Sequence, residues 1–144
     1  MAEFSWPVRV YYEDTDNGGV VYHANYLKFM ERARTEWLRA RGVEQDVLIE
    51  QEGLIFAVCS VQLDYLRPAR FNQLLSVSVN VAEVGRASLI FDQAIHLIIN
   101  EENDGVKSDL ALCQGRIKVA CLDASRLNPR AIPALVRQEI LGDD

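Results

Sequence analysis

The chain has 144 residues, 49% of them hydrophobic, and a formal net charge of −6. A chain of this size hides roughly two-thirds of its unfolded surface on folding, which is enough for a core without disulfides or metals. The acidic balance argues against a general nucleic-acid binder, because affinity for a phosphate backbone comes from clustered Lys and Arg. No segment approaches the roughly 20 apolar residues that span a bilayer, and the N-terminus lacks the pattern of a secretory signal. We therefore expect one domain, residues 1–144, in the cytoplasm.

The first predicted elements are a strand over residues 8–12 and a helix from residue 25 to about residue 41. In that helix apolar residues recur at helical spacing; they are Tyr26, Phe29, Met30, Ala33, Trp37 and Leu38. Gly42 is a natural stop, because glycine accepts the left-handed geometry that ends helices. Residues 44–51 favour a short second helix, and the proline-containing tail, residues 126–144, favours another.

Beyond residue 60 the period of the hydrophobic pattern changes to two, which is typical of half-buried antiparallel strands. This alternation predicts strands over residues 61–65, 75–81, 89–99 and 117–121, giving five with the first. Turns between them are marked by Arg67-Pro68, Val84-Gly85 and Asn103-Asp104-Gly105.

The lengths of these elements predict how they pack. A helix of about 16 residues is roughly 24 Å long, whereas strands of about 11 residues reach some 36 Å, so the strands can wrap around the helix. The predicted fold class is α+β, with one long central helix wrapped by a five-stranded antiparallel sheet. Because such a sheet keeps exposed edges, we expect it to pair with a second copy of the chain.

The three cysteines, Cys59, Cys113 and Cys121, are odd in number, lack CxxC spacing and lie among alternating strand-like residues. We expect all three to be buried free thiols. Free thiols favour a reducing, cytoplasmic location.

The segment before the predicted helix, residues 11–26, has the sequence YYEDTDNGGVVYHANY and gathers Glu13, Asp14 and Asp16. These acids could simply face water in a turn that leads into the positive end of the helix. However, Gly18-Gly19 would let a ligand approach the backbone closely, and the chain then reaches a helix N-terminus near His23. A carboxylate and unpaired N–H groups would then meet in one place.

Other chemistries find little support. The sequence has no GxSxG elbow for serine-type catalysis and no GxGxxG or Walker loop for a nucleotide fold. His96 lies in the middle of a predicted strand and is expected to be structural or on the surface. A metal site could be built from Glu13, Asp14, Asp16 and His23, yet none of the usual zinc spacings appears. We expect neither a metal nor a cofactor.

One stretch, residues 11–38, resembles the signature of the 4-hydroxybenzoyl-CoA thioesterase family of hotdog-fold proteins: YYEDTDNGGVVYHANYLKFMERARTEWL. It is similar in particular to the branch of bacterial acyl-CoA thioesterases associated with the Tol-Pal envelope system. The similarity continues through LDYLRPARFNQLLSV and GRASLIFDQAI, so it covers most of the chain. It implies a hotdog fold, homodimers with joined sheets often paired into homotetramers, and active sites at the subunit interface.

The resemblance also implies functional residues. By motif position, the family's catalytic carboxylate falls on Asp16, and His23 falls where the family places a backbone N–H against the thioester carbonyl. Substrate-binding positions from the same block are Gly19, Val20, Tyr22 and Tyr26. A second set, Gly85, Arg86 and Ser88, matches a segment that contacts the CoA nucleotide from a neighbouring subunit in some members. The acyl group would lie near Tyr22, Tyr26, Phe56 and Val58.

The expected reaction is hydrolysis of an acyl-CoA, or of an acyl carrier protein thioester, to the free acid. Asp16, ionised at neutral pH unless strongly buried, can serve as general base or as nucleophile, and the sequence leaves both routes open. A thiolate departs readily, which fits the absence of a full triad. Two alternatives stay open: a non-catalytic acyl-thioester-binding or envelope-complex protein, and a hydroxyacyl-thioester dehydratase. The branch resemblance further implies a peripheral link to inner-membrane lipid enzymes.

Overall fold

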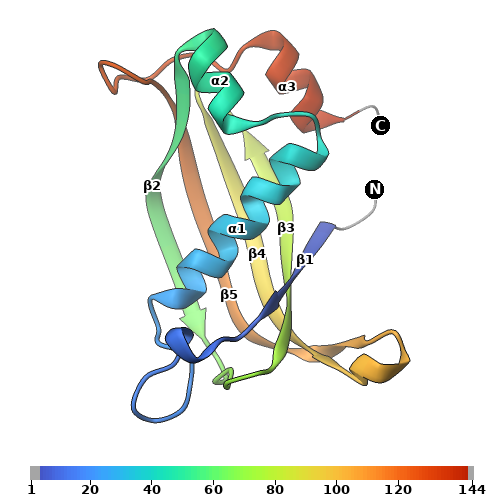
Figure 1. Ribbon diagram of the computed structural model, residues 1–144. Helices are drawn as coiled ribbons and strands as arrows, with labels where there is room; N and C mark the ends of the chain where they lie inside the picture. Colours follow the sequence, from blue (N-terminus) through green and yellow to red (C-terminus); the bar gives the residue numbers. More distant parts are fainter. Residues whose placement is uncertain (1–3, 143–144) are drawn as a thin grey trace.

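Five strands form one antiparallel sheet in the computed structural model, which describes residues 4–142, and their order is β1-β3-β4-β5-β2 (Figure 1). The strands are β1 (Phe4–Arg9), β2 (Leu54–Tyr65), β3 (Leu74–Val84), β4 (Ser88–Ile99) and β5 (Val106–Asp123). The helices are α1 (Asn25–Ala40), α2 (Gln45–Glu52) and α3 (Ala134–Leu141), with short 3₁₀ turns η1 (Tyr12–Asp14) and η2 (Glu101–Asn103). The predicted α+β class with five antiparallel strands is confirmed.

Helix α1 lies across one face of the sheet (Figure 1). Its apolar stripe is buried there, with Phe29, Met30 and Ala33 fully enclosed. Trp37 meets Phe91 of β4 edge to face, with ring centroids 5.4 Å apart. Burying one such side chain stabilises the fold by roughly 1.5–3 kcal/mol. The predicted helix is confirmed, and Gly42, with a φ of 85°, follows its end as expected.

The first strand was predicted in the wrong place. Residues 8–12 were expected to be extended, but β1 ends at Arg9 and Tyr12 opens the turn η1. The strand begins at Phe4 and contains Pro7. Proline is tolerated there because β1 is the edge strand of the sheet and need not donate to a neighbour on its outer side.

Strand β2 is also longer than predicted, because a bulge hides its first half. Val58 pairs with Val119 and Ser60 with Lys118, which leaves Cys59 as the extra residue. A bulge shifts the alternation of side chains between the two faces of the sheet by one residue. The hydrophobic period of two is therefore visible only from Val61 onward. The predicted turns at Val84-Gly85 and Asn103-Asp104-Gly105 do join β3 to β4 and β4 to β5.

One of the cysteine predictions is wrong, and it concerns the residue at the bulge of the edge strand β2. Cys113 and Cys121 are buried free thiols as expected, whereas Cys59 is free but exposed. Burial raises the pKa of the Cys113 thiol to about 12 and also raises that of Cys121.

Because only a thiolate reacts with alkylating agents, we expect iodoacetamide to label Cys59 in the native protein and to spare Cys113. Peptide mass spectrometry after a timed reaction checks this. In denaturant all three cysteines should react, which is the control. Native labelling of Cys113 at a rate close to that of Cys59 would contradict the buried position.

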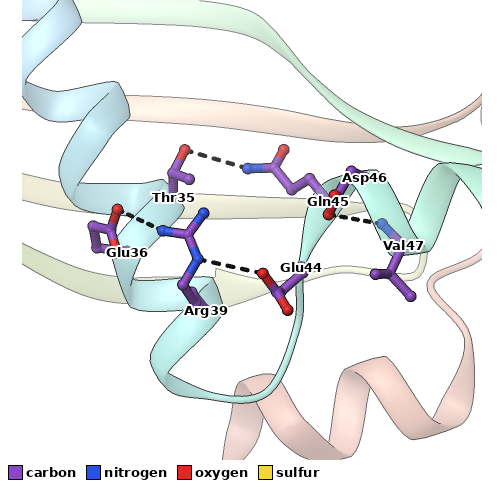
Figure 2. A network of polar contacts seen from close by, with 7 residues as sticks. All are labelled: Thr35, Glu36, Arg39, Glu44, Gln45, Asp46 and Val47. Carbon is purple, nitrogen blue, oxygen red and sulfur yellow. Dashed lines mark hydrogen bonds and ion pairs between the residues drawn. The ribbon is translucent and has the colours of Figure 1, made fainter.

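A polar network joins the end of α1 to the start of α2 (Figure 2). Arg39 pairs with Glu36 on its own helix and reaches Glu44 in the linker at 3.5 Å. Gln45 donates a hydrogen bond to the Thr35 hydroxyl at 3.3 Å, which directly links α2 to α1. This network fixes α2 near the beginning of β2, at the end of α1 that lies away from the acidic loop.

Candidate functional site

The acidic loop runs from β1 to α1 and is closed on itself by backbone hydrogen bonds. The N–H of Asp16 donates to the Val20 carbonyl at 2.9 Å, and the N–H of Gly19 donates back to the Asp16 carbonyl at 3.0 Å. Gly19 has a φ of 77°, which an L-residue adopts only with strain. The loop is tied to the rest of the protein by a bridge between Val20 and Arg70.

The two aspartates of the loop have different surroundings. Asp14 is 5% exposed, and its carboxylate accepts the N–H of Tyr11 at 2.8 Å and the side-chain amide of Asn25 at 2.9 Å. Asn25 is the first residue of α1, so Asp14 links the loop to the helix. Asp14 therefore has a structural role, because its two carboxylate oxygens accept these two hydrogen bonds.

Asp16 is exposed, and its Oδ1 atom accepts the N–H of Gly18 at 2.8 Å. Within residues 4–142 this is the one hydrogen bond to the Asp16 side chain, which leaves Oδ2 available to a ligand. This hydrogen bond orients the Asp16 carboxylate and occupies only one of its two oxygens.

Asp16 and His23 lie on the same cleft, which has a volume of about 350 Å³. Its walls come from the loop, the start of α1, the end of β2 and the segment that follows β2; they are Asp16, Val20, Val21, His23, Tyr26, Tyr65, Leu66, Arg67 and Pro68. Four of the predicted site residues are thus together: Asp16, Val20, His23 and Tyr26. Two more adjoin them, since Gly19 precedes Val20 and the exposed ring of Tyr22 lies 4.4 Å from that of His23.

His23 lies just outside α1, with Ala24 as the cap and Asn25 as the first helical residue. Its carbonyl accepts the hydroxyl proton of Tyr65 at 2.8 Å. Its N–H, by contrast, has no acceptor among residues 4–142. The first N–H groups of a helix carry partial positive charge, so this part of the cleft can hold a developing negative charge.

Sequence reasoning missed five residues of the cleft, Val21, Tyr65, Leu66, Arg67 and Pro68, and of these Tyr65 contacts His23 directly. Tyr65 ends β2, its ring lies 5.4 Å from that of Tyr26, and burial raises the pKa of both phenols. The Tyr26 hydroxyl accepts the N–H of Ala69 at 3.0 Å. The two tyrosines therefore hold the start of α1 against the segment after β2. The only signal was the position of Tyr65 within the matched stretch LDYLRPAR.

We expect Tyr65→Phe to lower the turnover of this site by about threefold to tenfold, because it removes one hydrogen bond, worth roughly 1 kcal/mol, from the His23 carbonyl. The ring packing on Tyr26 should survive, so the melting temperature should change little. Steady-state kinetics and a thermal melt of the same sample check both parts. An unchanged kcat would show that the hydrogen bond does not position His23.

The predicted CoA-contacting segment lies elsewhere. Gly85 and Arg86 lie in the turn between β3 and β4 and Ser88 begins β4; the carbonyls of Gly85 and Arg86 accept hydrogen bonds from Arg137 of α3. The loop bridge at Arg70 lies near the opposite end of β3, which an 11-residue strand places ~35 Å away. A single chain does not bring this segment to Asp16. Nor does it bring Phe56 and Val58 into the cleft, since both line a separate groove beside α1.

Residues 4–142 contain no group of three or more His, Cys, Asp or Glu side chains placed to hold a metal ion. The set suggested by the sequence is divided, because Asp14 is buried against Asn25 while Asp16 faces the cleft. In the same part of the chain, no helix has both the length and the apolar character needed to cross a membrane.

Known proteins are similar to this chain in sequence and in fold. The model of the thioesterase superfamily matches residues 18–101, more than half of the chain, including all of α1 and every cleft residue except Asp16, which lies just before the matched range. An acyl-CoA thioesterase, YbgC, of Haemophilus influenzae is 44% identical over 93% of this chain and 91% of its own length. A probable thioesterase from Bartonella henselae is similar in structure, with a TM-score of 0.80 and 31% identity over 92% of this chain and 100% of that chain. A 4-hydroxybenzoyl-CoA thioesterase shares the fold, with a TM-score of 0.84 and 15% identity over 96% of this chain and 98% of that chain.

Proposed function

Since this chain belongs to the thioesterase superfamily, we propose that it hydrolyses acyl-CoA thioesters to the free carboxylic acid and CoA, with Asp16 and His23 as its catalytic residues. The family and the enzyme class, a thioester hydrolase, are confirmed as the sequence predicted, and so is the hotdog fold. One observation supports the assignment of the site: Asp16, which has a carboxylate oxygen without a partner among residues 4–142, and His23, whose N–H has no acceptor there, line the same cleft.

In the proposed reaction the thioester carbonyl lies in the cleft, with its oxygen toward the N–H of His23. As the carbonyl becomes tetrahedral, negative charge grows on that oxygen, and a preorganised donor stabilises it; losing one such donor in an enzyme costs about 2.7–4 kcal/mol. Gly19 and Val20 leave room for the thioester to approach Asp16. The thiolate of CoA then departs without the help of a strong general acid, because a thiol is a good leaving group.

Asp16 can take either of two parts in this reaction. It can remove a proton from water as the water attacks, or it can attack the carbonyl itself and form a mixed anhydride that water then opens. A single turnover in oxygen-18 water tests the anhydride route. Label found in the Asp16 carboxylate would support that route, because it arises when water opens the anhydride at the Asp16 carbonyl. Label found only in the product acid is expected of the general-base route and also of an anhydride that water opens at the acyl carbon.

The binding of CoA in this proposal needs a second copy of the chain. Gly85, Arg86 and Ser88 are too far from Asp16 in their own chain, so they can contact the nucleotide only at a neighbour's cleft. A homodimer joined at the sheet edges, with pairing of dimers into a homotetramer, is therefore part of the proposal. The edge strand β2 supports it, because Val58 and Val61 are exposed apolar residues on that strand.

We also propose the cytoplasm as the location, because Cys113 and Cys121 are buried as free thiols. The association with the Tol-Pal envelope system and with inner-membrane lipid enzymes rests on the family branch alone. So does the alternative use of acyl carrier protein thioesters. A single domain of residues 1–144 is also part of the proposal, and it is supported by the one sheet that takes strands from Phe4 to Asp123.

Release of free thiol from a panel of acyl-CoAs, from acetyl to palmitoyl with a benzoyl member, tests the proposal. Catalytic release with at least one of them is the expected result. Binding without release would instead favour the non-catalytic acyl-thioester-binding protein. Formation of an enoyl thioester from a hydroxyacyl-CoA, without free thiol, would favour the dehydratase.

A further inference from the structure

A second cavity, the Arg34 groove, lies between the later part of α1, the start of α2 and the inner face of the sheet. Its volume is about 310 Å³. The strand side is apolar and includes Phe56, Val58, Leu89, Phe91 and Val119. The helix side includes Glu31, Arg34, Thr35 and Gln45, and a hydrogen bond joins Thr35 to Gln45 (Figure 2).

Arg34 is a buried cation in this groove. Its side chain belongs to a residue that is 8% exposed, and its Nη1 donates to the Gln93 carbonyl oxygen at 2.9 Å. Gln93 is fully engaged, since its amide donates to the carbonyls of Met30 and Ser78. A guanidinium has five N–H donors, and within residues 4–142 no carboxylate forms an ion pair with this one. Burial lowers the pKa of Arg34, and the neighbouring Glu31 acts in the opposite direction.

A buried cation with donors to spare is costly unless a partner is supplied. The nearest acid in the groove, Glu31, is exposed, so water screens its charge more than it screens that of Arg34. An oxygen of a bound molecule, above all a carboxylate, would therefore gain more from Arg34 than it would lose to Glu31. A guanidinium can hold a carboxylate through two parallel hydrogen bonds.

The groove also lies where an acyl chain could reach it. Tyr26 lines the cleft of Asp16, and Arg34 follows it by two turns, ~12 Å along α1. Strand β2 also runs between the two cavities, because Tyr65 at its end lines the cleft and Phe56 and Val58 near its start line the groove. Building on the proposed hydrolysis at Asp16, we propose that the Arg34 groove binds the far end of the acyl group and that Arg34 selects acyl groups bearing a carboxylate or hydroxyl oxygen there.

Matched acyl-CoAs test this selectivity. At each chain length from hexanoyl to dodecanoyl, kcat/KM is measured for the plain acyl-CoA, its ω-hydroxy form and its ω-carboxy form. The wild type should prefer an oxygenated form at one or more lengths by about tenfold or more, the range of one charge-assisted hydrogen bond. Arg34→Met should abolish that preference and Arg34→Lys should keep part of it. Arg32→Met, which removes the same charge from an exposed position of α1, should leave it unchanged.

Each variant serves as its own reference, because the preference is a ratio of substrates and is insensitive to a general loss of folded protein. A ratio that is unchanged in Arg34→Met at every length would overturn the proposal. If the ratio is unchanged and light scattering shows that Arg34→Met alters the oligomeric state, the proposal is likewise overturned, and Arg34 is assigned to a contact between copies of the chain.

Failure of the hydrolysis itself can be told apart from failure of this inference. If no thioester releases thiol, calorimetry with the same acyl-CoAs measures their binding to the wild type and to Arg34→Met. Tighter binding of the oxygenated members, lost in Arg34→Met, would support the role of Arg34 without any catalysis. Equal binding of all members by both proteins would overturn it.

Discussion

Asp16→Asn is expected to lower kcat/KM for acyl-CoA hydrolysis by at least about a hundredfold, equivalent to roughly 2.7 kcal/mol of barrier. Asparagine has nearly the same shape and keeps an oxygen that can accept the N–H of Gly18, so the loop should hold its conformation. It can neither take a proton from water nor form an anhydride with the acyl group. The loss should therefore appear in kcat, measured by free-thiol release, with little change in KM.

The stability of this variant is the control. Because Asp16 is exposed and makes one side-chain hydrogen bond in the described chain, its melting temperature should stay close to that of the wild type. Asn17→Ala, an exposed change in the same loop, should keep most of the activity. An Asp16→Asn variant that retains more than about a tenth of the wild-type kcat/KM would move the catalytic role to another group of the cleft.

The elements that the sequence predicted well are those whose periodicity is unbroken. Helix α1 is one, and strands β3 and β4 are others, whereas β5 was predicted only over residues 117–121 and in fact begins at Val106. The errors fall where local geometry interrupts a period: the 3₁₀ turn at Tyr12 shortens the first strand, and the bulge at Cys59 hides half of β2. Neither interruption has a strong signal in residue type.

The site was predictable only in part, for a similar reason. The acids of the loop stand out in sequence, but the chain must fold before Asp14 turns inward to Asn25 and Asp16 turns toward the cleft. Tyr65 joins His23 across a separation of 42 residues, a contact that no local pattern reveals. The distance between the cleft and the Gly85 turn also follows from strand direction, which the sequence alone does not specify.

Asp14→Ala is expected to show the opposite effect to Asp16→Asn, with a large loss of stability. It would leave the N–H of Tyr11 and the side-chain amide of Asn25 without their acceptor in a buried place. Unsatisfied buried donors of this kind cost about 1–3 kcal/mol, so we expect the free energy of unfolding to fall by about 2–4 kcal/mol. Urea denaturation followed by far-ultraviolet circular dichroism measures this.

Two control variants are compared with Asp14→Ala. Glu13→Ala, an exposed neighbour in the same 3₁₀ turn, should change stability by no more than about 0.5 kcal/mol. Asp14→Asn keeps one acceptor oxygen and should fall between wild type and Asp14→Ala. Because Asp14 holds the residue that begins α1, the remaining folded Asp14→Ala protein should also lose activity through a displaced His23. If Asp14→Ala were as stable as Glu13→Ala, the anchoring of the loop to α1 would have to come from other contacts, and the contrast between the two aspartates would disappear.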